Sequence, residues 1–214
     1  MTLEEKIKQA FKDSAERKFV ESVELSINLK GVDLSNPKNR INEEILLPKG
    51  RGREIKVALF GSEEMRLKVK DSADFIFGAE DLSKFADDKR EFKKLVNQID
   101  FFLAEANLMT TIGKSLGTVL GPRGKIPRAV PPSQDPSPQI ASLKKTVRVR
   151  SRDKRTFHVA VGNKKMSEKE LAENVKEVMK RITSKLEKGW GNIDSVFLKT
   201  TMGKSVKLEG GEMQ

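Results

Sequence analysis

The chain has 214 residues, of which 36% are hydrophobic and 34% charged, with a formal net charge of +11 and no cysteine. This composition excludes disulfides, a cysteine nucleophile and cysteine-based zinc sites, and no run approaches the roughly 20 apolar residues that a membrane span needs. No secretory hydrophobic region follows the first methionine, so we expect a cytoplasmic protein.

The positive charge is concentrated in the last third of the chain. Residues 146–214 carry 16 Lys and Arg against 9 Asp and Glu, whereas residues 1–52 carry 10 against 9 and residues 53–145 carry 16 against 13. A basic excess confined to one region is typical of a polyanion-binding surface. The alternative is a solubilising, ion-rich surface of the kind common in thermophile proteins.

The first part of the chain predicts a helix followed by two strands. Residues 3–15 have apolar side chains at helical spacing behind a capping-box signature. Residues 22–30 alternate apolar with polar side chains, which is typical of a strand with one buried and one polar face. Residues 33–40 are expected to be a loop, residues 41–47 a second strand, and residues 48–53 a flexible basic connector.

The middle of the chain alternates short apolar runs, two of them ending in Gly, with helical patterns. We expect strands at residues 55–61, 74–78 and 100–104. One helix is expected to begin at Ser62, and two others to cover residues 88–97 and 109–120. Such alternation is typical of a parallel α/β layer fold. The Pro-rich residues 129–138 are expected to be a loop, with a short helix at residues 139–143.

From Thr146 the strand pattern returns. We expect strands at residues 146–152, 156–162, 194–200 and 205–208, and one long amphipathic helix that is capped at Ser167 and runs through Leu186.

The simplest fold combines α+β and α/β classes in two domains. Residues 1–52 and 146–214 are expected to form a discontinuous, split βαβ-type α+β domain, with residues 53–145 inserted as a Rossmann-like three-layer α/β domain. The two connectors run side by side in this arrangement. Four residues in them are expected to act as a hinge: Gly50, Gly52, Lys145 and Thr146.

The sequence contains no catalytic constellation that we can identify. The Gly-Lys-Ser tripeptides that begin at Gly113 and Gly203 lack the glycine that a phosphate loop requires five residues earlier, where Leu108 and Leu198 stand. The single histidine, His158, has no cysteine or serine elbow near it. A small α/β enzyme acting on a phosphorylated metabolite stays open as the alternative to a non-catalytic binding protein.

The end of the last long strand offers chemistry that suits RNA. Thr200–Gly203 combines two hydroxyls, a flexible apolar side chain and a glycine that permits close approach. RNA presents 2′-hydroxyls and a shallow groove to such a tip. A small-molecule site, or a plain strand that enters a turn, is the alternative.

Three motifs together resemble the large-subunit ribosomal protein L-one family, the universal stalk protein. Residues 112–127 (Ile-Gly-Lys-Ser-Leu-Gly-Thr-Val-Leu-Gly-Pro-Arg-Gly-Lys-Ile-Pro) resemble its signature. Lys18-Phe19 with the following strand, and Thr200–Gly203, match its RNA-binding stretches, and the resemblance covers nearly the whole chain. The loops at residues 36–40 and 133–138 resemble the archaeal and eukaryotic branch, so the chain is similar to the archaeal type.

The resemblance implies a non-enzymatic constituent of the large ribosomal subunit in the mobile stalk near the tRNA exit site. The expected partners are large-subunit rRNA, exit-site tRNA and the protein's own mRNA, with no cofactor, no metal and no membrane. The implied functions are assistance in the release of deacylated tRNA and repression of its own translation through an rRNA-like site. We expect a cytoplasmic, ribosomal protein that is monomeric when free.

The resemblance also implies an RNA-binding face. Its residues, carried over motif by motif, are Lys18, Phe19, Glu21, Ser22, Glu24, Asn28, Ser195, Thr200, Thr201, Met202 and Gly203, with Arg150 and His158 as additional candidates. The carboxylates of Glu21 and Glu24 can accept from a 2′-hydroxyl or an exocyclic amine, although the alternative is that both are solvated strand residues. Lys204 stands where many relatives have Pro, which leaves the turn after Gly203 open.

Overall fold

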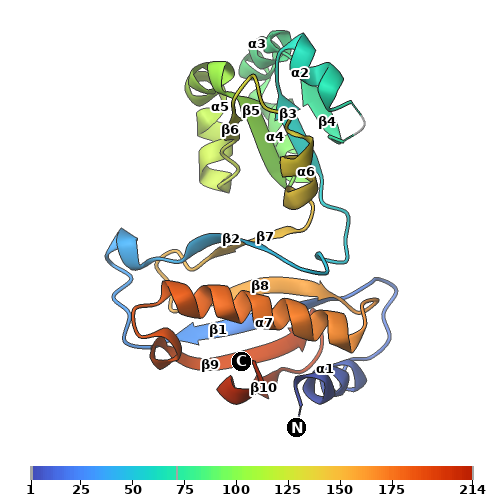
Figure 1. The fold of residues 1–214 in the computed structure, drawn as a ribbon, viewed down its shortest axis with the longest axis vertical. Coiled ribbons are helices and arrows are strands. Elements are labelled where there is room, and N and C mark those ends of the chain that lie inside the picture. The colour runs from blue at the N-terminus through green and yellow to red at the C-terminus, as the bar shows by residue number, and fades with distance from the viewer. Residues whose placement is uncertain (1, 71, 214) are drawn as a thin grey trace. The chain divides into compact units, whose positions relative to one another are not determined.

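The computed structural model describes residues 2–70 and 72–213 and divides into two compact units (Figure 1). The first unit joins Met1–Arg53 to Lys145–Gln214, and the second is Glu54–Lys144. Both units mix helices with sheets, which confirms the predicted mixed fold class. Among the described residues, no helix is long and apolar enough to cross a membrane.

An antiparallel sheet in the order β10-β9-β1-β8 forms the centre of the first unit. Its strands are β1 (Ser22–Leu29), β8 (Thr156–Asn163), β9 (Ile193–Thr200) and β10 (Val206–Leu208). On β1, Val23, Leu25 and Ile27 are fully buried, while the side chains between them stay partly exposed. The predicted alternation is therefore confirmed, and the sheet has one buried face and one polar face.

Two helices complete the core of this unit. Helix α7 (Glu168–Lys185) lies across the buried face of the sheet, as Figure 1 shows, and begins with a capping box between Ser167 and Glu170. Helix α1 (Leu3–Lys12) begins with the predicted capping box as well. The buried Lys6 of α1 donates to the Lys207 carbonyl at 3.0 Å and lies 2.8 Å from a Glu212 carboxylate oxygen, so it ties the two ends of the chain together.

A second, two-stranded antiparallel sheet pairs β2 (Asn42–Leu46) with β7 (Thr146–Arg150). Leu46 lies opposite Thr146, and the Leu47 amide donates to the Lys145 carbonyl at 3.0 Å. The connectors into and out of the second unit are thus paired within the first unit. Short 3₁₀ helices complete this unit: η1 (Pro37–Asn39), η3 (Gly189–Asn192) and η4 (Gly210–Glu212).

The residues expected to form a hinge are hydrogen-bonded within the first unit. Gly50 and Gly52 have positive φ values of 69° and 71°, which glycine adopts without strain. The Gly50 carbonyl accepts from Asn174 Nδ2 at 2.8 Å, and the Gly52 carbonyl accepts from the side-chain amide of Asn163. These bonds hold both glycines within the first unit, and the hinge stays a prediction.

The second unit is a three-layer α/β structure. Its parallel sheet has the order β4-β3-β5-β6, with β3 (Val57–Phe60), β4 (Phe75–Phe77), β5 (Phe101–Glu105) and β6 (Arg128–Val130). One face packs against α3 (Ala79–Asp87), α4 (Lys89–Gln98) and α5 (Met109–Arg123), and the other against α2 (Glu63–Lys68) and α6 (Ser137–Leu143). A 3₁₀ turn, η2 (Ala106–Leu108), precedes α5. Strands buried on both faces explain the continuous apolar runs of the sequence.

Three elements of the second unit differ from the prediction. Helix α3 was not predicted; it begins at Gly78, whose amide donates to the Asp81 carboxylate at 3.0 Å. Strand β6 was predicted as loop, because three residues between two prolines show no readable period. Helix α5 runs three residues past its predicted end, since it is terminated by Gly124 in the left-handed conformation rather than by Pro122.

We predict that Asn174→Ala destabilises the first unit. The Asn174 side chain is fully buried and donates to the Gly50 and Val161 carbonyls while accepting from the Lys49 amide. Removing it leaves these buried groups without that partner, so the free energy of unfolding should fall by about 3 kcal/mol. Urea unfolding measures this, with Asn42→Ala at an exposed strand position as the control. Equal stability of the two variants would contradict the assignment.

Candidate nucleic-acid interface

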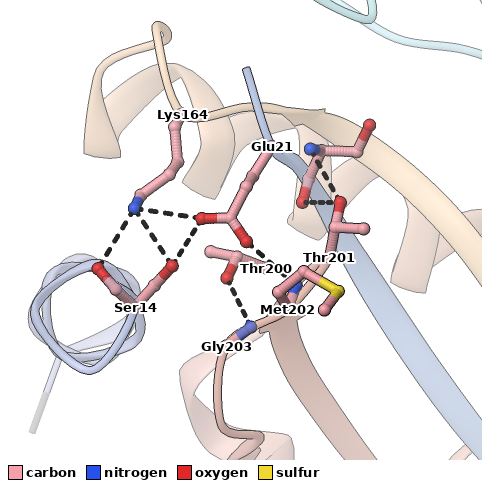
Figure 2. Close-up of polar contacts among 8 residues, drawn as sticks. Ser14, Glu21, Lys164, Thr200, Thr201, Met202 and Gly203 are labelled. Carbon is pink, nitrogen blue, oxygen red and sulfur yellow. Dashed lines mark hydrogen bonds and ion pairs between the residues drawn. The ribbon is translucent and has the colours of Figure 1, made fainter. Parts of the chain in front are cut away.

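The end of β9 lies beside the start of β1, and the backbone amides that follow β9 donate to other groups of the protein (Figure 2). The Thr201 amide donates to the Ser22 carbonyl at 3.0 Å, and the Met202 amide to a Glu21 carboxylate oxygen at 2.9 Å. The Gly203 amide donates to Thr200 Oγ1 at 3.1 Å. Three consecutive amides are therefore used inside the protein, which leaves the tip (residues 200–203) poor in backbone donors for a ligand.

Only glycine fits at the end of this tip. A Cβ built on Gly203 would overlap Thr200 Oγ1 and lie 3.2 Å from Ser14 Cβ. A side chain at position 203 would displace the buried Thr200 hydroxyl, which accepts from the Gly203 amide, so Gly203 has a structural reason that is independent of any ligand.

The centre of the tip is a buried carboxylate. The Glu21 side chain is only 1% exposed and lies 3.2 Å from Lys164 Nζ, while Ser14 Oγ donates a short hydrogen bond to it (Figure 2). Burial opposes ionisation of Glu21, but the bonds from Ser14, the Met202 amide and Lys164, together with the charge of Lys164, outweigh it. They lower the pKa of Glu21 from 4.5 to about 2. The carboxylate is therefore an ionised structural group.

Exposed side chains surround this buried centre. Phe19 is 53% exposed and Met202 61% exposed, and Lys18 and Thr201 are exposed as well. The Thr201 hydroxyl accepts from the Ser22 amide at 3.1 Å, which holds it at the junction of the two strands. Two apolar surfaces beside a hydroxyl can stack on a base and contact a sugar.

The other candidates extend from the tip along the polar face of the sheet. Strand pairing places Glu24 opposite Lys199, and Ser26 between Phe197 and His158. Six residues after Ser22, Asn28 donates to Ser195 Oγ at 2.8 Å and accepts from the Thr156 hydroxyl at 2.7 Å. At about 3.3 Å per residue, the polar face spans roughly 20 Å from the tip to this group. The structure thus brings Ser22, Glu24, Asn28, His158 and Ser195 onto one surface.

Three predicted candidates lie elsewhere. The side chains of Glu21 and Thr200 are buried, so this structure does not offer them for the direct RNA contact expected from the sequence. They accept hydrogen bonds from the Met202 and Gly203 amides instead. Arg150 lies on β7, opposite Asn42, in the two-stranded sheet rather than in the sheet that carries the tip. Its place in the interface stays a prediction.

Sequence reasoning did not identify four residues of this region. Phe197 and Lys199 share the polar face, and their alternation with the buried Val196 and Leu198 carried that signal. Ser14 and Lys164 were missed because no local pattern shows that residues so far apart in the sequence meet at Glu21.

The signature segment, residues 112–127, lies in the second unit. Gly113 lies within helix α5 and not in a loop, which agrees with the absence of a phosphate-loop spacing. Lys125 donates to the Val96 and Ile99 carbonyls and so caps the end of α4. No group of three or more acidic, His or Cys side chains within the described part of the chain could hold a metal ion.

The buried carboxylate predicts an acid-dependent stability. Because folding lowers the pKa of Glu21 from 4.5 to about 2, Glu21 contributes stability above pH 4.5 that is lost as the pH falls toward 2. The full contribution is about 3 kcal/mol. The difference in unfolding free energy between the wild type and Glu21→Gln, measured in urea, should be constant from pH 7 to 5 and shrink below pH 4.5. A difference that does not change down to pH 3 would contradict the pKa.

Comparison with known proteins identifies the family. The pattern described as "Ribosomal protein L1p/L10e family" matches residues 10–204. The chain is 61% identical over 207 residues to "Large ribosomal subunit protein uL1" of Picrophilus torridus, covering 97% of both chains. The proteins of the same name from Thermoplasma acidophilum (93% of this chain and 92% of that one) and Methanocella arvoryzae (95% and 96%) are 60% and 47% identical. The chain therefore belongs to the ribosomal protein L1 family, in agreement with the archaeal type indicated by its motifs.

Proposed function

We propose that the protein is an rRNA-binding constituent of the large ribosomal subunit, in the cytoplasm, and that the tip and the polar face of the first unit form its RNA-binding surface. The family is one of ribosomal proteins and not of enzymes, so a metabolic enzyme is rejected. One observation supports the proposed site above all. Exposed Phe19, Met202 and Thr201 surround a rigid centre at one end of a continuous polar sheet face.

The chemistry of the tip favours sugars and bases over phosphates. Its three backbone amides are used internally, and a buried carboxylate lies beneath them. An anion finds no free amide among residues 201–203, whereas 2′-hydroxyls and exocyclic amines bring donors that match carbonyl and hydroxyl acceptors. Lys18, Lys199 and Lys204 around the tip can supply a few phosphate contacts.

The finer functions are part of this proposal. Assistance in the release of deacylated tRNA at the exit site, and repression of the protein's own mRNA through an rRNA-like site, follow from the family resemblance. Repression requires that the same surface binds two RNAs, and a rigid, sugar- and base-reading tip would select the same local RNA structure in both. We place the tRNA contact on the second unit, which lacks the tip residues.

We predict that Thr201→Ala and Met202→Ala weaken rRNA binding without unfolding the protein, since both side chains are exposed. Loss of the hydroxyl should cost roughly 1–3 kcal/mol if its RNA partner is left buried and unpaired. Filter binding measures the affinity, with Thr118→Ala and Leu67→Ala at other exposed positions as matched controls. The slope of log affinity against log salt should be shallow and unchanged, because no cation is removed. Wild-type affinity in both variants, or a large fall in melting temperature, would refute the site.

We also predict that the first unit alone carries nearly the full rRNA affinity. Its connectors lie close enough to be joined, because the Leu47 amide contacts the Lys145 carbonyl at 3.0 Å, so a short Gly-rich link can replace residues 54–144. The retained residues, 1–53 and 145–214, hold +10 of the formal +11 charge. The second unit, expressed separately, should bind rRNA weakly in the same assay. High affinity of the second unit, or a folded first unit that does not bind, would overturn this division.

A further inference from the structure

We propose that Lys164 and Ser14 are positioning residues of the RNA-binding tip. They hold the Glu21 carboxylate in the one place from which it can fix the Met202 amide (Figure 2). The inference rests on the proposed RNA-binding function and extends it to two residues that lie outside residues 200–203. It assigns specificity to a buried ion pair rather than to an exposed charge.

The carboxylate of Glu21 is oriented by donors on two sides. One oxygen, Oε2, lies 3.2 Å from Lys164 Nζ and accepts from Ser14 Oγ. The other, Oε1, accepts from the Met202 amide at 2.9 Å. The donors of Lys164 and Ser14 therefore fix the plane and the position of the group that anchors the tip.

Lys164 has its donors committed to this network. Its ammonium group has three donors, and three acceptors surround it: Glu21 Oε2 at 3.2 Å, Ser14 Oγ at 3.1 Å and the Ser14 carbonyl at 3.4 Å. Its side chain is only 24% exposed. The Lys164 amide also donates to the Glu21 carbonyl at 3.0 Å, so the backbones are joined as well. Lys164 is thus used internally and is not free to bind a phosphate.

The hydrogen bond between Ser14 and Glu21 also closes the loop that carries Phe19. Ser14 lies at the start and Glu21 at the end of the exposed residues 15–20, so a bond between them brackets that loop. A charged carboxylate that is 1% exposed is costly to leave unpaired. Without Lys164, Glu21 would turn toward water or take up a proton, and the Met202 amide and the loop would lose their common anchor.

The test compares Lys164→Met with Lys165→Met, the exposed neighbour that loses the same charge. We expect Lys164→Met to weaken binding of the large-subunit rRNA transcript roughly tenfold or more, with an unchanged salt slope. Lys165→Met should stay within about threefold of the wild type or lower the slope by a single phosphate contact. In the free protein, Lys164→Met should accelerate hydrogen exchange at the Met202 amide, with a folded core by circular dichroism.

A second variant separates positioning from direct contact. Glu21→Gln removes the charge that needs Lys164, and its side-chain carbonyl can still accept from the Met202 amide, so the Glu21→Gln/Lys164→Met double variant should bind better than Lys164→Met alone. Wild-type affinity in Lys164→Met overturns the proposal, as does a loss with a reduced salt slope and no rescue. If the wild type fails to bind rRNA, the proposed function fails, while Met202 exchange still decides whether Lys164 positions the tip.

Discussion

Strand β1 lies between β8 and β9, and the rest of the first unit depends on this arrangement. A strand from the beginning of the chain fills the centre of a sheet whose other strands come from its end, so the core forms only when both ends of the chain are present. The segment between them must leave and return at neighbouring points, which the pairing of Leu46 with Thr146 provides. Sheet topology thereby explains why a complete α/β unit is inserted in the middle of the sequence.

The same topology creates the surface that we propose binds RNA. Because β1 pairs antiparallel with β9, the start of one strand meets the end of the other, and Ser22 and Thr201 lie side by side although they are 179 positions apart. The turn after β8 reaches the same edge and brings Lys164 to Glu21. The chain before β1, after β8 and after β9 runs beyond the ends of these strands, where the backbone no longer has ladder partners. The buried Glu21 carboxylate supplies fixed hydrogen bonds there instead.

The sequence predicts the strands of the first unit well because a strand with one buried face has a period of two. That period, followed one step further, places Glu21 in phase with Val23 and Leu25, and Thr200 in phase with Leu198. Both are buried accordingly, although the family resemblance indicated direct RNA contacts. By contrast, the bonds of Glu21 with Lys164 and the Met202 amide span 143 and 181 residues, and no local pattern contains such pairings. Strand β6 was missed because Arg128-Ala129-Val130 is not an apolar run, unlike the equally short Phe75–Phe77 of β4.

The donor-poor tip and the basic surface of the protein have different roles in the proposed recognition of RNA. Phosphate contacts attract and orient any RNA, and their strength falls with salt. The amides of the tip donate within the protein, so they do not add to the attraction of phosphates. A change in the conformation of the tip to fit a wrong RNA would break these hydrogen bonds. Ionisation of Glu21 across the whole neutral and mildly acidic range keeps this rigidity constant. Under the proposed function, hydrogen bonds that are buried before any RNA arrives set the specificity, and the exposed lysines set the frequency of encounter.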